Sequence, residues 1–139
     1  MKYKYTTVSG ARNTDGRSTK RPVIEVEVSY GSQSRKFLGL IDSGADQIIM
    51  PAVIADVLGI NRDTCPKRST MGIDMQPMES FTSEVTLHLA DQTDSFKATV
   101  VFIDTDVPVL LGREGFFDQY RIKFEQDHDT FEITPVKKK

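Results

Sequence analysis

An aspartate at the end of an apolar run is the residue whose type and position could most readily do chemistry in this chain. Asp42 follows Leu40 and Ile41 and precedes Ser43 and Gly44, so its carboxylate leaves a buried strand on a tight loop. An ionised carboxylate beside a core strand is costly unless it is hydrogen-bonded or partly protonated, and such groups tend to sit where their acidity is used. Asp-Ser-Gly is also a common turn tripeptide, so Asp42 alone leaves a catalytic acid and a simple turn equally open.

A second stretch lies far downstream. Residues 107–113 read Val-Pro-Val-Leu-Leu-Gly-Arg, and the apolar part is typical of a short strand buried on both faces. Gly112 would let the end of this strand lie close under the loop at Asp42, where a side chain would collide. The two stretches resemble the two signatures of retropepsin-like aspartic proteases, the single-domain relatives of pepsin that work as homodimers. The resemblance covers roughly residues 21–131, and the signatures stand in the family's order.

The resemblance implies an all-β fold, a closed retropepsin-like β-barrel with a flap hairpin and one or two short helices. Several short strands separated by polar turns also favour a barrel or a sandwich. With 139 residues the chain is too short for the two lobes of a pepsin-type enzyme. We therefore expect one domain over residues 1–139, with a loop at 9–20 that could be mobile and a polar tail at 135–139.

The alternation of apolar and polar residues predicts the elements that would position Asp42. Strands are expected at residues 2–8, 22–30, 35–41, 81–90, 96–103 and 107–111, and in two runs within 121–134. A helix is expected to begin at Pro51 and to end at Gly59. Its core-facing stripe would consist of Val53, Ile54, Val57 and Leu58. A second short helix is expected at 113–120, with Phe116 and Phe117 turned inward.

Residues 70–81 stand where the family places its flap, a hairpin that closes over the substrate. Flaps of the family often carry several glycines, whereas this segment offers only Gly72 and three methionines. Methionine adapts to varied apolar surfaces, which suits a lid that meets different side chains. The same methionines could equally be plain packing.

Peptide hydrolysis by acid chemistry needs two carboxyl groups, one to take a proton from water and one to donate a proton to the carbonyl oxygen. The chain has one Asp-Ser-Gly loop, and a two-fold axis through the site would bring Asp42 beside its own copy. Two carboxylates about 3 Å apart cannot both ionise readily, so they share one proton. The resemblance thus implies a homodimeric aspartic endopeptidase that acts on peptides or proteins and needs no metal and no organic cofactor.

The resemblance also implies roles for the residues around Asp42. The catalytic set would be Asp42, Ser43 and Gly44, with the Ser43 hydroxyl bonded across the dimer axis or, on a plainer interpretation, within its own turn. Gly112 and an ion pair between Arg113 and Asp46 would support the loop. Substrate contacts would come from Ala45, Asp46, Ile48, Met71, Gly72, Ile73, Val107, Pro108 and Leu110.

Composition limits the other classes of protein. The formal net charge of -2 gives no basic patch that would point to nucleic acid. Cys65 is the single cysteine, so no internal disulfide can form and no oxidising compartment is needed. No apolar stretch is long enough to span a bilayer, and the first 20 residues have no leader pattern. We therefore expect no membrane partner and a cytoplasmic location, unless the chain was cut from a longer precursor.

Two other interpretations stay open. The chain could be a non-proteolytic retropepsin-like binding or dimerisation module, or a small β-barrel adaptor in which Asp-Ser-Gly is only a turn. The intact tripeptide favours the enzyme, since a scaffold needs no acid there. Retroviral enzymes pair their chain ends to form the dimer sheet, and the long polar N-terminal segment here departs from that pattern. A dimer of this chain could therefore be held differently, for example through its C-terminal hairpin.

Overall fold

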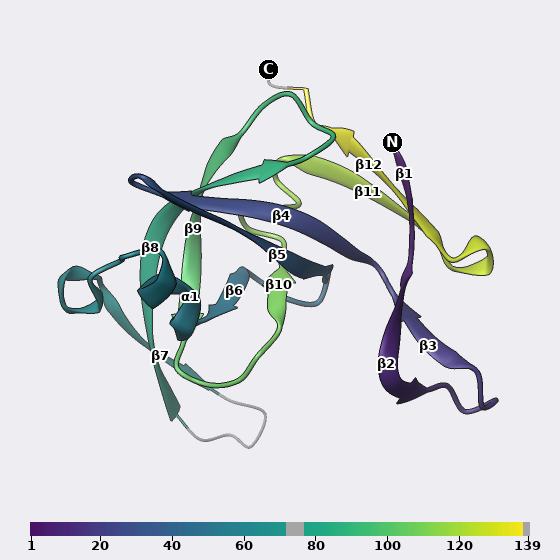
Figure 1. Cartoon of the computed structure of the whole chain (residues 1–139), viewed down its shortest axis with the longest axis horizontal. Coiled ribbons are helices and arrows are strands. Elements are labelled where there is room, and N and C mark those ends of the chain that lie inside the picture. Colours follow the sequence, from purple (N-terminus) through teal and green to yellow (C-terminus); the bar gives the residue numbers. More distant parts are fainter. Residues whose placement is uncertain (72–76, 138–139) are drawn as a thin grey trace.

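The computed structural model describes residues 1–71 and 77–137, which form a curved sheet with smaller β elements beside it (Figure 1). The strands of the curved sheet are β4 (Val23–Tyr30), β5 (Gln33–Ile41), β6 (Ile48–Pro51), β7 (Lys67–Met71), β8 (Pro77–Leu89), β9 (Phe96–Ile103) and β10 (Val109–Leu111). The other strands are β1 (Lys2–Lys4), β2 (Thr6–Arg12), β3 (Ser18–Arg21), β11 (Tyr120–Glu125) and β12 (Thr130–Pro135). One α-helix, α1 (Ala52–Val57), and two 3-10 helices, η1 (Arg62–Thr64) and η2 (Gln126–His128), complete the described elements.

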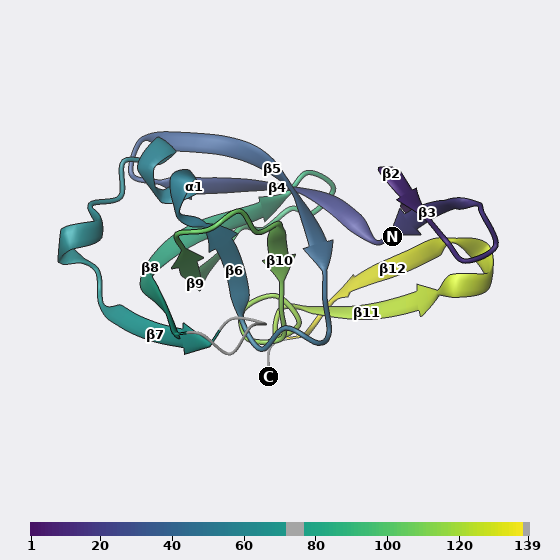
Figure 2. The ribbon, with the colours of Figure 1, turned by 90° about the horizontal axis from the view of Figure 1, so that it is seen from below.

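The curved sheet closes on itself. Its seven strands follow the order β4-β5-β10-β6-β9-β8-β7, and an additional pairing of β4 with β8 closes the barrel. The short strand β10 lies between β5 and β6, parallel to β5 and antiparallel to β6. A three-stranded sheet of order β1-β12-β11 and the β2-β3 hairpin project from one end of the barrel (Figures 1 and 2). The predicted all-β closed barrel is confirmed.

Strand alternation builds the core as the sequence predicts. Ile24, Val26 and Val28 of β4 are buried, whereas Glu25 between them is exposed. The largest fully buried side chains come from several strands and from the segments after β10, and include Met50, Leu87, Phe102, Leu111, Phe116, Phe131 and Ile133. The barrel interior is therefore filled by side chains from strands that are far apart in sequence.

The loop predicted at residues 9–20 is wrong, because most of this segment belongs to the β2-β3 hairpin. The turn is closed by bonds from the Asn13 N–H to the Arg17 carbonyl (2.8 Å) and from the Gly16 N–H to the Asn13 carbonyl (2.9 Å). Gly16 has a φ of +87°, which glycine adopts at low cost. A hairpin with two largely exposed faces needs no apolar period, so the sequence carried no strand signal here. The strand predicted at 2–8 is likewise divided into β1 and β2.

The second helix, predicted at residues 113–120, is also wrong. This segment is a series of turns, in which the Phe117 N–H donates to the Gly112 carbonyl (3.3 Å) and the Tyr120 N–H to the Phe116 carbonyl (3.1 Å). Gly115 has a φ of +98°, which a right-handed helix does not allow. Phe116 is nevertheless fully buried and Phe117 is half-buried, so the predicted inward packing is present without the helix.

The helix expected from Pro51 is confirmed as α1, but half of its predicted core stripe is wrong. Ile54 and Leu58 are buried, whereas Val53 and Val57 are 60% and 45% exposed. The buried face is completed by Ala52 and Ala55, whose small side chains let the helix lie close to the barrel. In the described part of the chain, no helix is both long and apolar enough to cross a membrane.

The β7-β8 hairpin occupies the position predicted for the flap. Its strands pair from Lys67 with Phe81 to Met71 with Pro77. Residues 72–76, which include the predicted substrate contacts Gly72 and Ile73, lie outside the described residues. The closing role of this hairpin stays a prediction.

We expect Phe102→Ala to destabilise the protein by about 3 to 5 kcal/mol, because it removes a large, fully buried ring from the core. The Phe102 ring stacks on Phe81 at a centroid distance of 5.3 Å. Val53→Ala is the control, and should change the free energy of unfolding by less than about 0.5 kcal/mol, because Val53 is exposed on α1. Denaturant unfolding at one fixed protein concentration measures both variants. Equal losses would contradict the assignment of the core.

Candidate active site

Asp42 leaves the end of β5 and is half-buried. Its N–H donates to the carbonyl of Leu111 at 3.1 Å, so the first residue of the loop is still bonded to β10. The carboxylate Oδ1 accepts a hydrogen bond of 2.8 Å from the Gly44 N–H. The Ala45 N–H donates to the Asp42 carbonyl at 3.2 Å and closes the turn. These bonds fix the direction in which the Asp42 carboxylate points.

The segment after β10 lies directly against the same loop. The Arg113 N–H donates to the Ala45 carbonyl and the Glu114 N–H donates to the Asp46 carbonyl, each at 2.9 Å. A Cβ atom at Gly112 would lie 2.2 Å from the Gln47 carbonyl oxygen and 2.7 Å from that of Ala45. The close approach predicted at Gly112 is therefore present, and only glycine fits there.

Two side-chain contacts join the same pair of segments. The Arg113 guanidinium forms the predicted ion pair with the Asp46 carboxylate, and the Gln47 amide donates to Glu114 at 3.2 Å. The Arg113 and Asp46 side chains are 61% and 80% exposed, so their pair adds little free energy. The backbone bonds, rather than the ion pair, hold the loop.

An apolar row crosses the barrel beside Asp42. Strand register places Leu110 of β10 opposite Leu40 of β5 on one side and opposite Ile49 of β6 on the other. All three side chains are half-buried, so each keeps part of its apolar surface outside the core. Leu40 stands two residues before Asp42 and shares its face of the strand.

The substrate contact predicted at Ile48 does not fit this geometry. Ile48 is fully buried and points into the core, whereas its neighbour Ile49 points to the outer face beside Leu110. Sequence reasoning missed Ile49 and Leu40 as candidate substrate contacts. Period-two alternation counted back from Asp42 would have found Leu40, but Ile49 depends on the pairing of β6 with β10.

The other predicted residues lie in varied positions. Ala45 is buried under the loop, and Ser43 is exposed and makes no hydrogen bond to any described residue. Val107 and Pro108 precede β10, in a bend where Val107 is half-buried and Pro108 is exposed. Met71 is the last residue of β7. The roles predicted for these residues in catalysis and substrate binding stay predictions.

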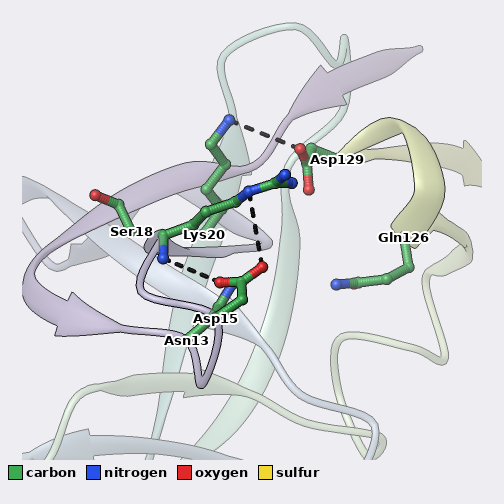
Figure 3. A pocket seen from close by; sticks show the side chains of 7 residues that line it. Asn13, Asp15, Ser18, Lys20, Gln126 and Asp129 are labelled. Atoms are coloured by element: carbon green, nitrogen blue, oxygen red, sulfur yellow. Dashed lines mark hydrogen bonds and ion pairs between the residues drawn. The ribbon is translucent and has the colours of Figure 1, made fainter.

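A polar hollow elsewhere on the surface is a poorer candidate. It lies between the β2-β3 hairpin and η2 and includes Asn13, Lys20 and Asp129 (Figure 3). Lys20 pairs with Asp129 at 3.7 Å, and Arg17 pairs with Asp15 at 3.7 Å, so its charges are already balanced. Among the described residues, no three His, Cys, Asp or Glu side chains converge as a metal site requires.

We expect Gly112→Ala to destabilise the protein by more than about 2 kcal/mol, because its Cβ atom would displace the backbone of the Asp42 loop. Gly59→Ala is the matched control. Gly59 has a φ of +78° but no atom within 4 Å of its added Cβ, so this change should cost only about 1 to 2 kcal/mol. Thermal or denaturant unfolding measures the difference, and a Gly112→Ala protein as stable as Gly59→Ala would contradict the close contact.

Sequence comparison alone does not place this chain, since no protein-family model and no curated protein matches it. Solved structures do match. A retropepsin-like aspartic protease from Rickettsia conorii is 19% identical, with a TM-score of 0.55, over 96% of this chain and 98% of that chain. EIAV protease in complex with the inhibitor HBY-793 is 22% identical, with a TM-score of 0.54, over 68% of this chain and 83% of that one.

The third match is the retroviral protease-like domain of Ddi1 from Leishmania major. It is 16% identical, with a TM-score of 0.52, and the alignment covers 82% of this chain and 90% of that domain. At these identities a match shows the fold alone. The fold predicted from the two signatures is confirmed, and the chain has the retropepsin-like fold.

Proposed function

We propose that this protein is an aspartic endopeptidase that hydrolyses peptide bonds with water activated by two Asp42 carboxylates, one from each subunit of a homodimer. The observation that carries the proposal is the loop of Asp42 itself. Its carboxylate is held by the Gly44 N–H at 2.8 Å, and its backbone rests on Gly112. Within a retropepsin-like fold, a loop fixed in this way supports an acid with a catalytic role better than a simple turn does.

The chemistry follows from one proton shared by two carboxyl groups. The ionised Asp42 takes a proton from water while the oxygen of that water attacks the peptide carbonyl carbon. The protonated Asp42 of the other subunit donates its proton to the carbonyl oxygen, which gives a neutral tetrahedral diol. The first Asp42, now protonated, gives its proton to the amide nitrogen while the partner carboxylate takes a proton from a hydroxyl of the diol. The C–N bond then breaks, and the acid and amine products leave.

The apolar row formed by Leu40, Ile49 and Leu110 favours substrates with apolar side chains beside the cut bond. An extended peptide would lie over Leu40, Ile49 and Leu110, beneath the β7-β8 hairpin, and would bond through its backbone. Apolar side chains next to the cut bond would then pack on this row.

A cytoplasmic location stays a prediction, based on the single Cys65.

We expect Asp42→Asn to lower peptide cleavage by at least about 100-fold, because an amide can neither accept nor donate the shared proton. Cleavage is measured as the products released from a mixed peptide library between about pH 4 and 7, where a carboxyl pair would be singly protonated. Asp106→Asn is the control, because Asp106 is exposed in the bend before β10. Identical digests from the native protein and Asp42→Asn would refute the enzyme and favour a binding module.

We expect Leu40→Ser to lower cleavage of peptides with apolar residues at the cut bond by about 10- to 100-fold, through loss of one apolar contact. Leu38→Ser is the control on the same face of β5, where the side chain is 64% exposed and lies farther from Asp42. The ratio of kcat/KM for apolar and polar peptides measures the effect. A similar change in both variants would exclude the apolar row as the substrate surface.

A further inference from the structure

We propose that two copies of this chain associate through the outer edge of β11, antiparallel, so that their small sheets form one continuous six-stranded sheet. In this arrangement Arg121 of each copy lies opposite Glu125 of the partner subunit. The inference rests on the proposed function, because one chain supplies one Asp42 and only a pair completes the site. It goes further by naming the surface, the register and the charges that hold the pair.

The outer edge of β11 has unused backbone groups. β11 is the last strand in the order β1-β12-β11, and no strand of the described chain pairs with its other side. The N–H and C=O of Ile133 in β12 both bond to Met1, at 2.9 Å each, so they point away from β11. Because successive residues point to opposite edges, Glu132 and Thr134 bond to β11 instead, opposite Lys123 and Arg121.

The same alternation continues along β11. Since Arg121 and Lys123 use their N–H and C=O groups toward β12, those of Ile122 and Phe124 point to the outer edge. A second β11 can therefore bond there, with Ile122 of each copy opposite Phe124 of the other. The two residues of each such pair exchange two N–H···O bonds, so the two pairs supply four backbone hydrogen bonds.

The charges and the length of β11 together select this register. With the two-fold axis at Lys123, Arg121 faces Glu125 of the partner subunit twice, at the cost of one Lys123 facing its own copy. Moving the axis to Ile122 would instead set Arg121 against Lys123 twice. An axis at Phe124 would set Lys123 against Glu125 twice but would pair only residues 123–125 within the strand. The axis at Lys123 keeps all of residues 121–125 inside the strand.

The opposite edge of the sheet fits a second copy poorly. β1 has only three residues, and antiparallel self-pairing about Tyr3 would set Lys2 against Lys4 twice. On β11, by contrast, Phe124 is 39% exposed and would be covered by the partner. Glu125 lies 3.4 Å from Lys2 of its own chain, and Arg121 of the partner subunit would add a second cation to this carboxylate.

The start of β11 lies on the same side of the molecule as the loop that carries Asp42 (Figure 2). The described end of the β7-β8 hairpin, the loop after β5 and the start of β11 all lie on one side of the molecule, the lower side in Figure 2. In Figure 1 the same three segments follow one another from the bottom to the top of the barrel. One two-fold axis along this side would bring each β11 beside its copy and each Asp42 loop beside its copy.

Charge reversal tests the register. We expect Arg121→Glu and Glu125→Arg each to weaken self-association at least about tenfold, because each creates two like-charge pairs. Mixing the two variants should restore association, since both cross-pairs of the mixed dimer are then opposite in charge. Sedimentation velocity over a concentration series, with peptide cleavage on the same samples, measures both properties. Lys36→Glu, on an exposed barrel site, is the control.

The outcomes separate this surface from the proposed function. A native protein that dimerises and cleaves peptides, with neither reversal nor mixing having an effect, would overturn the β11 interface and leave the enzyme intact. Association that follows the charge swaps without any Asp42-dependent cleavage would support the interface and overturn the enzyme. A native protein that stays monomeric at micromolar concentration would overturn the interface.

Discussion

The backbone of residues 111–114 lies directly against the loop that carries Asp42, and the rest of the structure depends on that contact. Three backbone hydrogen bonds join the two segments. Gly112 allows this close approach because it has no Cβ atom, which would collide with the carbonyl oxygens of Ala45 and Gln47. β10 reaches this position because it lies between β5 and β6. A carboxylate on a loop without such bonds would adopt many orientations, whereas these bonds restrict the orientation of the Asp42 carboxylate.

The same contact connects the site to the small sheet. The chain passes from Gly112 through a run of tight turns into β11, and the buried Phe116 anchors those turns in the core. The orientation of β11 is therefore coupled to that of the Asp42 loop through a short and well-packed segment. In the proposed homodimer, the Asp42 site and the association surface would therefore lie on neighbouring parts of one chain segment.

The surface beside Asp42 owes its character to strand pairing. β5, β10 and β6 each contribute one half-buried aliphatic side chain, and no one of these strands could form an apolar surface alone. The neighbouring Gly39 lets Leu111 pack closely, since an added Cβ would lie 2.8 Å from a Leu111 methyl group. The packing of Leu111 against Gly39 on the inner face thus helps to hold Leu40 and Leu110 in place on the outer face of the same strands.

The sequence by itself determined most strand positions, because period-two alternation is a local signal. Its two signatures, through the resemblance that they carry, also gave the closed barrel, the Asp42 loop and the close approach at Gly112. It could not distinguish Ile48 from Ile49, since one residue of register exchanges core and surface and only pairing with β10 sets that register. It also missed the β2-β3 hairpin, whose exposed faces leave no apolar period, and predicted a helix where Gly115 turns the chain. Tertiary structure decided these features because each depends on contacts between residues that are far apart in the sequence.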